Sequence, residues 1–345
     1  MKYTTLPNTN IKVSKICLGT MTWGNQNTQD EGFAQMDMAL DKGVNFFDVA
    51  ELYPVPANAE TYAETERIIG NWFTKTGNRD KVVLATKIAG PGDYTAHIRT
   101  TGFSKDALNE AVDNSLKRLQ TDYIDLYQLH WPERNTNTFG QRDYKHNPNE
   151  KWEDNFNEVL HNLDELIKSG KIRQVGLSNE TGWGTMRYLE ESKYNNLPRM
   201  ITIQNAYSLV CRSFENDLAE ISHRENIGLL AYSPMACGVL SGKYIKGTDQ
   251  ANSRLNLFPR FSRYSSEQST EATKRYLKIA EDNNMTLAQM SLAFVNERPF
   301  LTSNIIGATS LEQLKENIDS INMSLSEDLM KAINKVHEEI PNPAT

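Results

Sequence analysis

Cysteine is scarce in this sequence of 345 residues, which has only Cys17, Cys211 and Cys237. Their number is odd and their spacing is wide, so they fit neither a disulfide framework nor a zinc-binding pattern. This usage favours a reducing compartment. We also expect no metal site, because His146 and its acidic neighbours lack a recognisable ligand spacing.

Long apolar runs are lacking too. No run of eighteen apolar residues occurs, and the first nineteen residues have no apolar core of signal-peptide length. The net charge of -7, from 37 basic and 44 acidic side chains, argues against attraction of the whole chain to nucleic acid or to an anionic membrane. We therefore expect a cytoplasmic protein that binds neither, and any anion must be held by a local site.

What the sequence does contain is a repeated alternation of short apolar, β-branched runs with longer amphipathic segments, which predicts parallel strands connected by helices. The predicted strands are 15–18, 45–48, 82–87, 124–128, 174–176, 201–204, 228–232 and 303–306. The predicted helices are 32–42, 61–76, 104–119, 157–169, 182–193, 216–225, 268–283 and 311–320. Each strand thus has one helix after it.

Local signals mark several helix ends. Gly43, Gly77 and Gly170 each follow a predicted helix, where glycine tolerates the left-handed backbone that ends it. Thr309, with Glu312 three residues later, predicts a capping box at the start of the last barrel helix.

Eight βα units without a flexible linker favour an α/β fold with one closed (β/α)8 TIM barrel, forming a single domain over residues 1–345. The alternative is a doubly wound sheet, but no G-x-G-x-x-G follows the first strand. Three additions are predicted: a segment before the first strand, a polar loop over 132–155, and an insertion over 241–266. A further helix over 326–339 is expected outside the barrel or across its bottom.

Polar residues follow three consecutive strands. Asp48 ends the second strand in FDVAELY, Lys87 ends the third in VVLATK, and His130 follows the fourth in DLYQLHWP. Strand ends converge at the mouth of a barrel, and Tyr53 on the loop after Asp48 can reach the same point. Taken singly, each residue would more often be structural, in an ion pair or an ordinary loop; together they predict a catalytic site.

These residue types suit carbonyl reduction, in which a hydride reaches the carbon and a proton reaches the oxygen. A free tyrosine titrates near ~10. We expect the Lys87 ammonium to lower the pKa of Tyr53 and Asp48 to hold Lys87 by a charge-assisted hydrogen bond. Neutral His130 would orient the substrate oxygen.

Longer strings carry a family resemblance: GTMTWG, SLKRLQTDYIDLYQLHWP, GKIRQVGLSNE, IQNAYS and AYSPMACGVLSGKY. The sequence resembles the aldo-keto reductase superfamily over almost its whole length, including the branch of the potassium-channel β-subunits. That family's catalytic Asp, Tyr, Lys and His match the four residues above. The resemblance implies an NADPH-dependent oxidoreductase acting on a small aldehyde or ketone, with Tyr53 as general acid and base.

The resemblance also implies where NADPH (or NADP+) binds, at the barrel mouth. The nicotinamide end is expected to contact Thr20, Met21, Asp48, Ser178, Asn179, Gln204 and the ring of Tyr232. The pyrophosphate is expected along Ser233, Pro234, Met235, Cys237, Gly238 and Lys243. The adenosine is expected near Gly307, Thr309, Gln313, Glu316 and Asn317.

Selection of NADPH over NADH requires a cation at the 2′-phosphate. Arg254 is the main candidate and Lys243 a second. Arg260 and Arg263 compete for the same role.

Two other functions are open at this point. A nucleotide-sensing regulatory subunit would bind NADPH with little turnover, but His130 completes a catalytic set. A lyase or aldolase would need Lys87 as a Schiff base with a lowered pKa, whereas Asp48 is expected to raise it. Trp23, Tyr94, Trp131 and Tyr207 are expected to line an aromatic, mostly apolar substrate cavity that suits aldehydes. Substrate, direction, pathway and oligomeric state are left open.

Overall fold

The computed structural model describes residues 1–249 and 251–345. Eight parallel strands close into a barrel in the order β10-β3-β4-β5-β6-β7-β8-β9. They are β3 (Ile16–Gly19), β4 (Phe46–Asp48), β5 (Val83–Ile88), β6 (Ile124–Leu129), β7 (Ile172–Ser178), β8 (Met200–Ala206), β9 (Gly228–Tyr232) and β10 (Leu301–Ile306). The predicted (β/α)8 barrel and its eight strands are confirmed, with ends shifted by a few residues.

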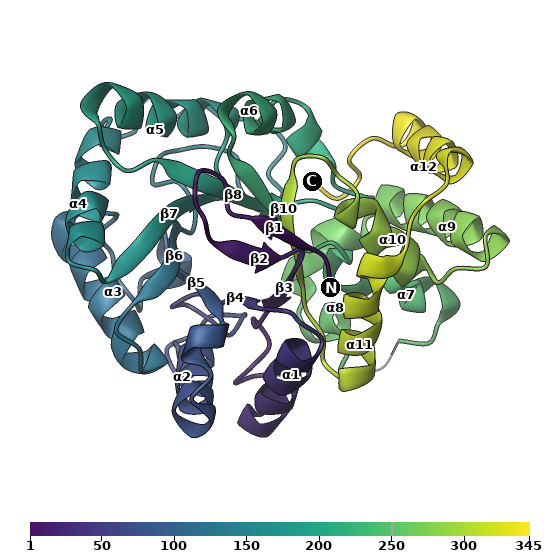
Figure 1. Ribbon diagram of the computed structural model, residues 1–345. Coiled ribbons are helices and arrows are strands. Elements are labelled where there is room, and N and C mark those ends of the chain that lie inside the picture. The colour runs from purple at the N-terminus through teal and green to yellow at the C-terminus, as the bar shows by residue number, and fades with distance from the viewer. Residues whose placement is uncertain (250) are drawn as a thin grey trace.

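Helices surround the barrel (Figure 1). The eight that were predicted are α1 (Gln29–Asp41), α2 (Glu64–Thr76), α3 (Lys105–Leu119), α4 (Phe156–Lys168), α5 (Gly182–Asn195), α6 (Leu218–Glu225), α9 (Glu267–Asp282) and α11 (Leu311–Asp319). Gly43, Gly77 and Gly170 end α1, α2 and α4 with φ of 80°, 67° and 79°, as expected for helix stops.

Two helix predictions were wrong. The segment between β9 and β10 holds a second long helix, α10 (Leu287–Asn296), so one helix per strand does not hold there. The first turn of α11 is capped by Ser310, whose side chain accepts from the Gln313 backbone N–H, rather than by a box of Thr309 and Glu312.

Two additions precede and follow the βα repeat. The N-terminal segment forms an antiparallel hairpin of β1 (Tyr3–Thr5) and β2 (Lys12–Ser14), which lies over the middle of the barrel in Figure 1. Leu6 and Val13 of this hairpin pack with the apolar barrel interior, and so close its bottom. The last helix, α12 (Glu327–Glu339), packs outside the barrel against α9, where Arg275 pairs with Glu339 at 2.8 Å.

The other two additions follow the carboxyl ends of strands. The polar loop comes after β6, and the insertion after β9 contains the short helices α7 (Lys243–Lys246) and α8 (Arg254–Leu257) and a 3-10 turn, Pro259–Ser265. Both border the barrel mouth, as expected; Gln250 in the insertion lies outside the described residues. Within the described residues, no helix is both long enough and apolar enough to cross a bilayer.

Candidate active site

A cavity of about 930 Å³ lies at the barrel mouth. One wall comes from the loops after β4, β5 and β6, and carries Tyr53, Tyr94 and Trp131. The opposite wall comes from the ends of β7 to β10 and the insertion. Every residue predicted to bind the cofactor lines this cavity, as do Asp48, Tyr53 and His130.

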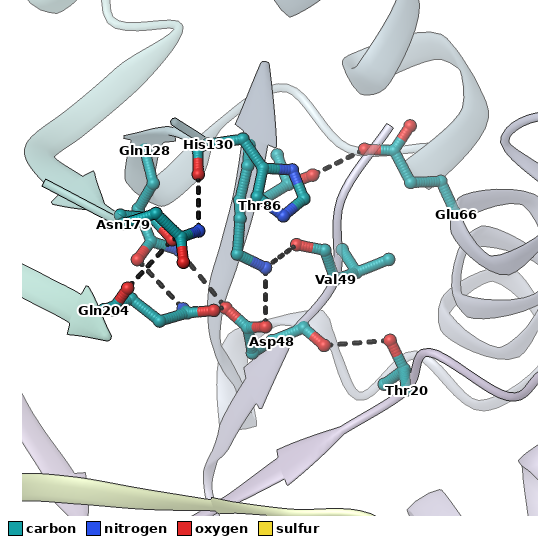
Figure 2. A network of polar contacts seen from close by, with 11 residues as sticks. Thr20, Asp48, Val49, Glu66, Thr86, Gln128, His130, Asn179 and Gln204 are labelled. Carbon is teal, nitrogen blue, oxygen red and sulfur yellow. Dashed lines mark hydrogen bonds and ion pairs between the residues drawn. The ribbon is translucent and has the colours of Figure 1, made fainter. Parts of the chain in front are cut away.

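A buried ion pair lies beneath the cavity. Lys87 in β5 donates from Nζ to Asp48 Oδ2 at 2.6 Å and to the Val49 carbonyl at 2.8 Å. Asp48 Oδ1 accepts from Gln204 at 2.8 Å and Gln128 at 3.2 Å. Figure 2 shows Asp48 between the two glutamines on one side and Val49 and Thr20 on the other. Both Asp48 oxygens are thus engaged.

Tyr53 and His130 face each other above this pair. Their ring centroids are 5.8 Å apart with an edge-to-face tilt, and Lys87 Nζ lies 4.9 Å from the centroid of the Tyr53 ring. Lys87 is fully buried and does not line the cavity. The structure therefore brings all four predicted residues together, with three at the cavity surface and Lys87 behind them.

Burial dominates the electrostatics of Tyr53. It raises the pKa of the Tyr53 phenol well above its usual value, and the charge of Asp48 raises the pKa further, while Arg254 opposes this shift. The expectation that Lys87 gives Tyr53 a lowered pKa was wrong, because loss of solvation outweighs nearby cations.

His130 shifts in the opposite sense. Burial and then the Lys87 charge hold the pKa of His130 well below its usual value. The imidazole is therefore neutral near pH 7, as expected. Its Nδ1 has no hydrogen-bond partner among the described residues.

Burial also shifts the pKa of Lys87. It lowers the pKa of Lys87 more than Asp48 raises it, so the expected net direction was wrong. A lowered pKa would suit a Schiff-base lysine. The Lys87 amine, however, is bound by Asp48 and Val49 and lies behind the cavity, which argues against that chemistry on grounds of access.

A chain of hydrogen bonds links His130 to Tyr232 on the opposite wall. Asn179 Nδ2 donates to the His130 carbonyl at 2.9 Å, and Asn179 Oδ1 accepts from the Tyr232 hydroxyl at 2.7 Å. Ser178 Oγ donates to the Gln204 carbonyl at 2.9 Å. Asn179 and Tyr232, both predicted at the nicotinamide, are thereby fixed relative to His130.

Backbone turns shape the rest of this wall. After β9 the chain turns sharply, with positive φ at Ser233 (53°), Cys237 (54°) and Gly238 (91°). Beside Gly307, after β10, there is open space: no heavy atom lies within 4 Å of where a Cβ would stand. Both features leave backbone accessible to a ligand.

Four cations line the cavity: Lys243, Arg254, Arg260 and Arg263. None forms an ion pair within the part of the chain that the structure describes. Arg254 is bound through Nη1 to Gln26 at 2.9 Å, while its buried Nε and Nη2 have no hydrogen-bond partner there and lie near the Cys237 thiol. Arg254 thus has two buried nitrogens that could bind an anion.

Two predicted lining residues do not reach the cavity. Trp23 packs in the core under α1, donating to Gln35 at 3.1 Å, and Tyr207 is buried with its hydroxyl on Glu215. Tyr94 and Trp131 do line it. Phe139 also lines the cavity and was not predicted there, because the polar loop around it has no periodic pattern.

Comparison with known proteins agrees with this geometry. Residues 15–338 match the model of the Aldo/keto reductase family. Protein tas of Escherichia coli is 46% identical over 351 residues, covering 100% of both chains. The uncharacterized oxidoreductase YrpG of Bacillus subtilis is 33% identical over 97% of this chain and 96% of its own. Norsolorinic acid reductase A of Aspergillus parasiticus is 27% identical over 95% of this chain and 78% of its own. The chain belongs to the aldo/keto reductase family, and it is an oxidoreductase.

Proposed function

We propose that this chain is an NADPH-dependent reductase that transfers a hydride to a small-molecule aldehyde or ketone, with Tyr53 as general acid. Residues 1–345 would act as one domain. The observation that carries the proposal is the buried Lys87–Asp48 pair, 2.6 Å apart, directly behind the Tyr53 ring at the cavity surface. Members of this family generally use NADP(H).

The residues present fit such a cofactor. Arg254 offers two buried nitrogens without partners, and Gly307 borders open space. Ser178 and Asn179 place polar groups on one wall of the cavity, and Tyr232 places an aromatic ring on the same wall. When bound, the cofactor supplies the hydride.

The chain's own residues manage the proton. Tyr53 keeps its proton because its pKa is raised, and gives that proton to the carbonyl oxygen as negative charge develops there. The phenolate left behind is stabilised by the Lys87 ammonium, which Asp48 holds in place. Neutral His130 orients the carbonyl oxygen from the facing position.

The test is NADPH oxidation, followed by absorbance, with a panel of aromatic and aliphatic aldehydes. We expect carbonyl-dependent oxidation, and we expect Tyr53→Phe to lose nearly all turnover while its affinity for NADPH is unchanged. Unchanged turnover in Tyr53→Phe would refute the assigned acid. Tight NADPH binding without turnover across the panel would instead favour a nucleotide-sensing subunit.

Cofactor selectivity is tested separately. Loss of two charged donors, each contributing roughly 1.5–3 kcal/mol, should weaken NADPH binding about 100-fold or more in the double variant Lys243→Ala, Arg254→Ala. NADH binding should change much less. The two single variants divide the effect between the residues, and equal losses for both nucleotides would contradict recognition of the 2′-phosphate.

A further inference from the structure

The insertion after β9 crosses the barrel mouth. Arg260, in its 3-10 turn, places the guanidinium carbon 4.1 Å from the centroid of the Tyr94 ring. Tyr94 follows β5, and the strand order puts β5 and β9 on opposite sides of the barrel. Arg260 therefore reaches the wall opposite its own strand.

That opposite wall carries the proton donor. The Tyr94 hydroxyl accepts from the Ala57 backbone N–H at 2.7 Å, in the segment that follows Tyr53. Next to it, Trp131 and Phe139 pack edge to face with ring centroids 5.7 Å apart. The residues expected around the adenosine follow β10 instead. Arg260 thus belongs to the substrate end of the cavity.

Arg260 is an exposed residue at the rim of the cavity, and no carboxylate of the described residues pairs with it. Among the described residues it has no hydrogen bond or ion pair, and its contacts are with the rings of Tyr94 and Phe261. Asp48, the carboxylate nearest the reacting centre, is already paired with Lys87. Stacking on a ring fixes the plane of a guanidinium while leaving its N–H donors free for a carboxylate.

We propose that the substrate is an aromatic aldehyde or ketone that also bears a carboxylate, bound by Arg260 while its carbonyl lies at Tyr53. The aromatic wall of Tyr94, Trp131 and Phe139 would hold the ring between these two points. This inference rests on the proposed reductase function and names its substrate class. It also removes Arg260 from the candidates for the 2′-phosphate.

The test compares kcat/KM for 3- and 4-carboxybenzaldehyde with that for their methyl esters, which have the same ring and carbonyl but no charge. We expect the unmodified protein to favour one of the acids by roughly tenfold or more, as for a charged hydrogen bond. In Arg260→Gln the acid-to-ester ratio should fall to about one. Arg224→Gln removes the same charge from an exposed site on α6 and should keep the preference.

Three results would overturn the proposal: equal kcat/KM for acids and esters, a preference that survives in Arg260→Gln, or a raised KM for NADPH in that variant. Absence of turnover with every aldehyde would count against the reductase function itself. Calorimetric titration of 4-(hydroxymethyl)benzoate and its methyl ester, with NADP+ present, separates the two cases because it needs no turnover. Binding of the carboxylate that depends on Arg260 supports the anion site, and equal binding of both compounds refutes it.

Discussion

Tyr53 and His130 are both removed from water at the barrel mouth, and burial moves their pKa values in opposite directions. A phenol is neutral when protonated, so burial preserves its proton; an imidazole is neutral when deprotonated, so burial removes its second proton. Both shifts favour uncharged side chains near pH 7. The proposed reduction requires these protonation states, in which a proton donor faces a neutral orienting group.

The pH dependence of turnover follows from these directions. Tyr53 stays protonated beyond the usual phenol range, and His130 stays neutral below the usual imidazole range, so kcat/KM for carbonyl reduction should be flat from about pH 6 to about pH 9. Oxidation of the alcohol product needs the phenolate and should rise with pH over the same interval. Steady-state rates in both directions check this. An acidic limb near pH ~6.5 in the reduction profile would mean that His130 titrates normally.

Residue identity alone predicted which side chains meet, but not how burial acts on them. Asp48, Lys87 and His130 could be placed because strand ends converge on one mouth. The pKa directions of Tyr53 and Lys87 were predicted wrongly because solvent exclusion is a property of the assembled barrel. Trp23 was placed wrongly because a loop has no alternation to fix the direction of a side chain.

Among the elements, α10 shows why amphipathic periodicity cannot predict every helix. Nearly all of its residues are buried, so its sequence is apolar on all sides and lacks the polar face that marked the other helices. A start signal was present: Thr286 Oγ1 accepts from the Gln289 N–H, and Gln289 Oε1 accepts from the Thr286 N–H. That capping box could have located the helix.

The cap of α10 should contribute measurably to stability. Thr286→Ala removes the acceptor for the Gln289 N–H and should lower the free energy of unfolding by about 1 kcal/mol. Thr286→Ser keeps the hydroxyl and should stay close to the original value. Denaturant melts of the three proteins provide the comparison; equal losses in both variants would show that the threonine methyl group, rather than the cap, is what matters.

Across the whole molecule, the two ends of the barrel have separate roles. The bottom is closed by Leu6 and Val13 of the hairpin, while the cavity and all four predicted catalytic residues are at the mouth. Strand order and helix positions could be predicted because the βα repeat is regular. The hairpin and the course of the insertion could not, because neither follows that repeat.

This separation predicts that stability and catalysis can be changed independently. Leu6 is fully buried, so Leu6→Ala should lower the free energy of unfolding by about 2–5 kcal/mol through lost burial and a residual cavity. At a temperature where the variant remains folded, kcat/KM should be unchanged. Leu6→Met, of similar volume, should recover most of the stability. A parallel fall in kcat/KM in Leu6→Ala would show that the bottom of the barrel is coupled to the mouth.

Leu6 and Val13 close the bottom of the barrel, whereas the mouth opens into the cavity. Beneath Asp48 the interior is packed with apolar side chains such as Phe46, Leu126 and Leu230. In the proposed reaction, Tyr53 lines the cavity and would be reprotonated from solvent that enters where the product leaves. A bulky alcohol that dissociates slowly would block the entry of solvent as well as of the next substrate. Slow release of the product would therefore also delay the reprotonation of Tyr53.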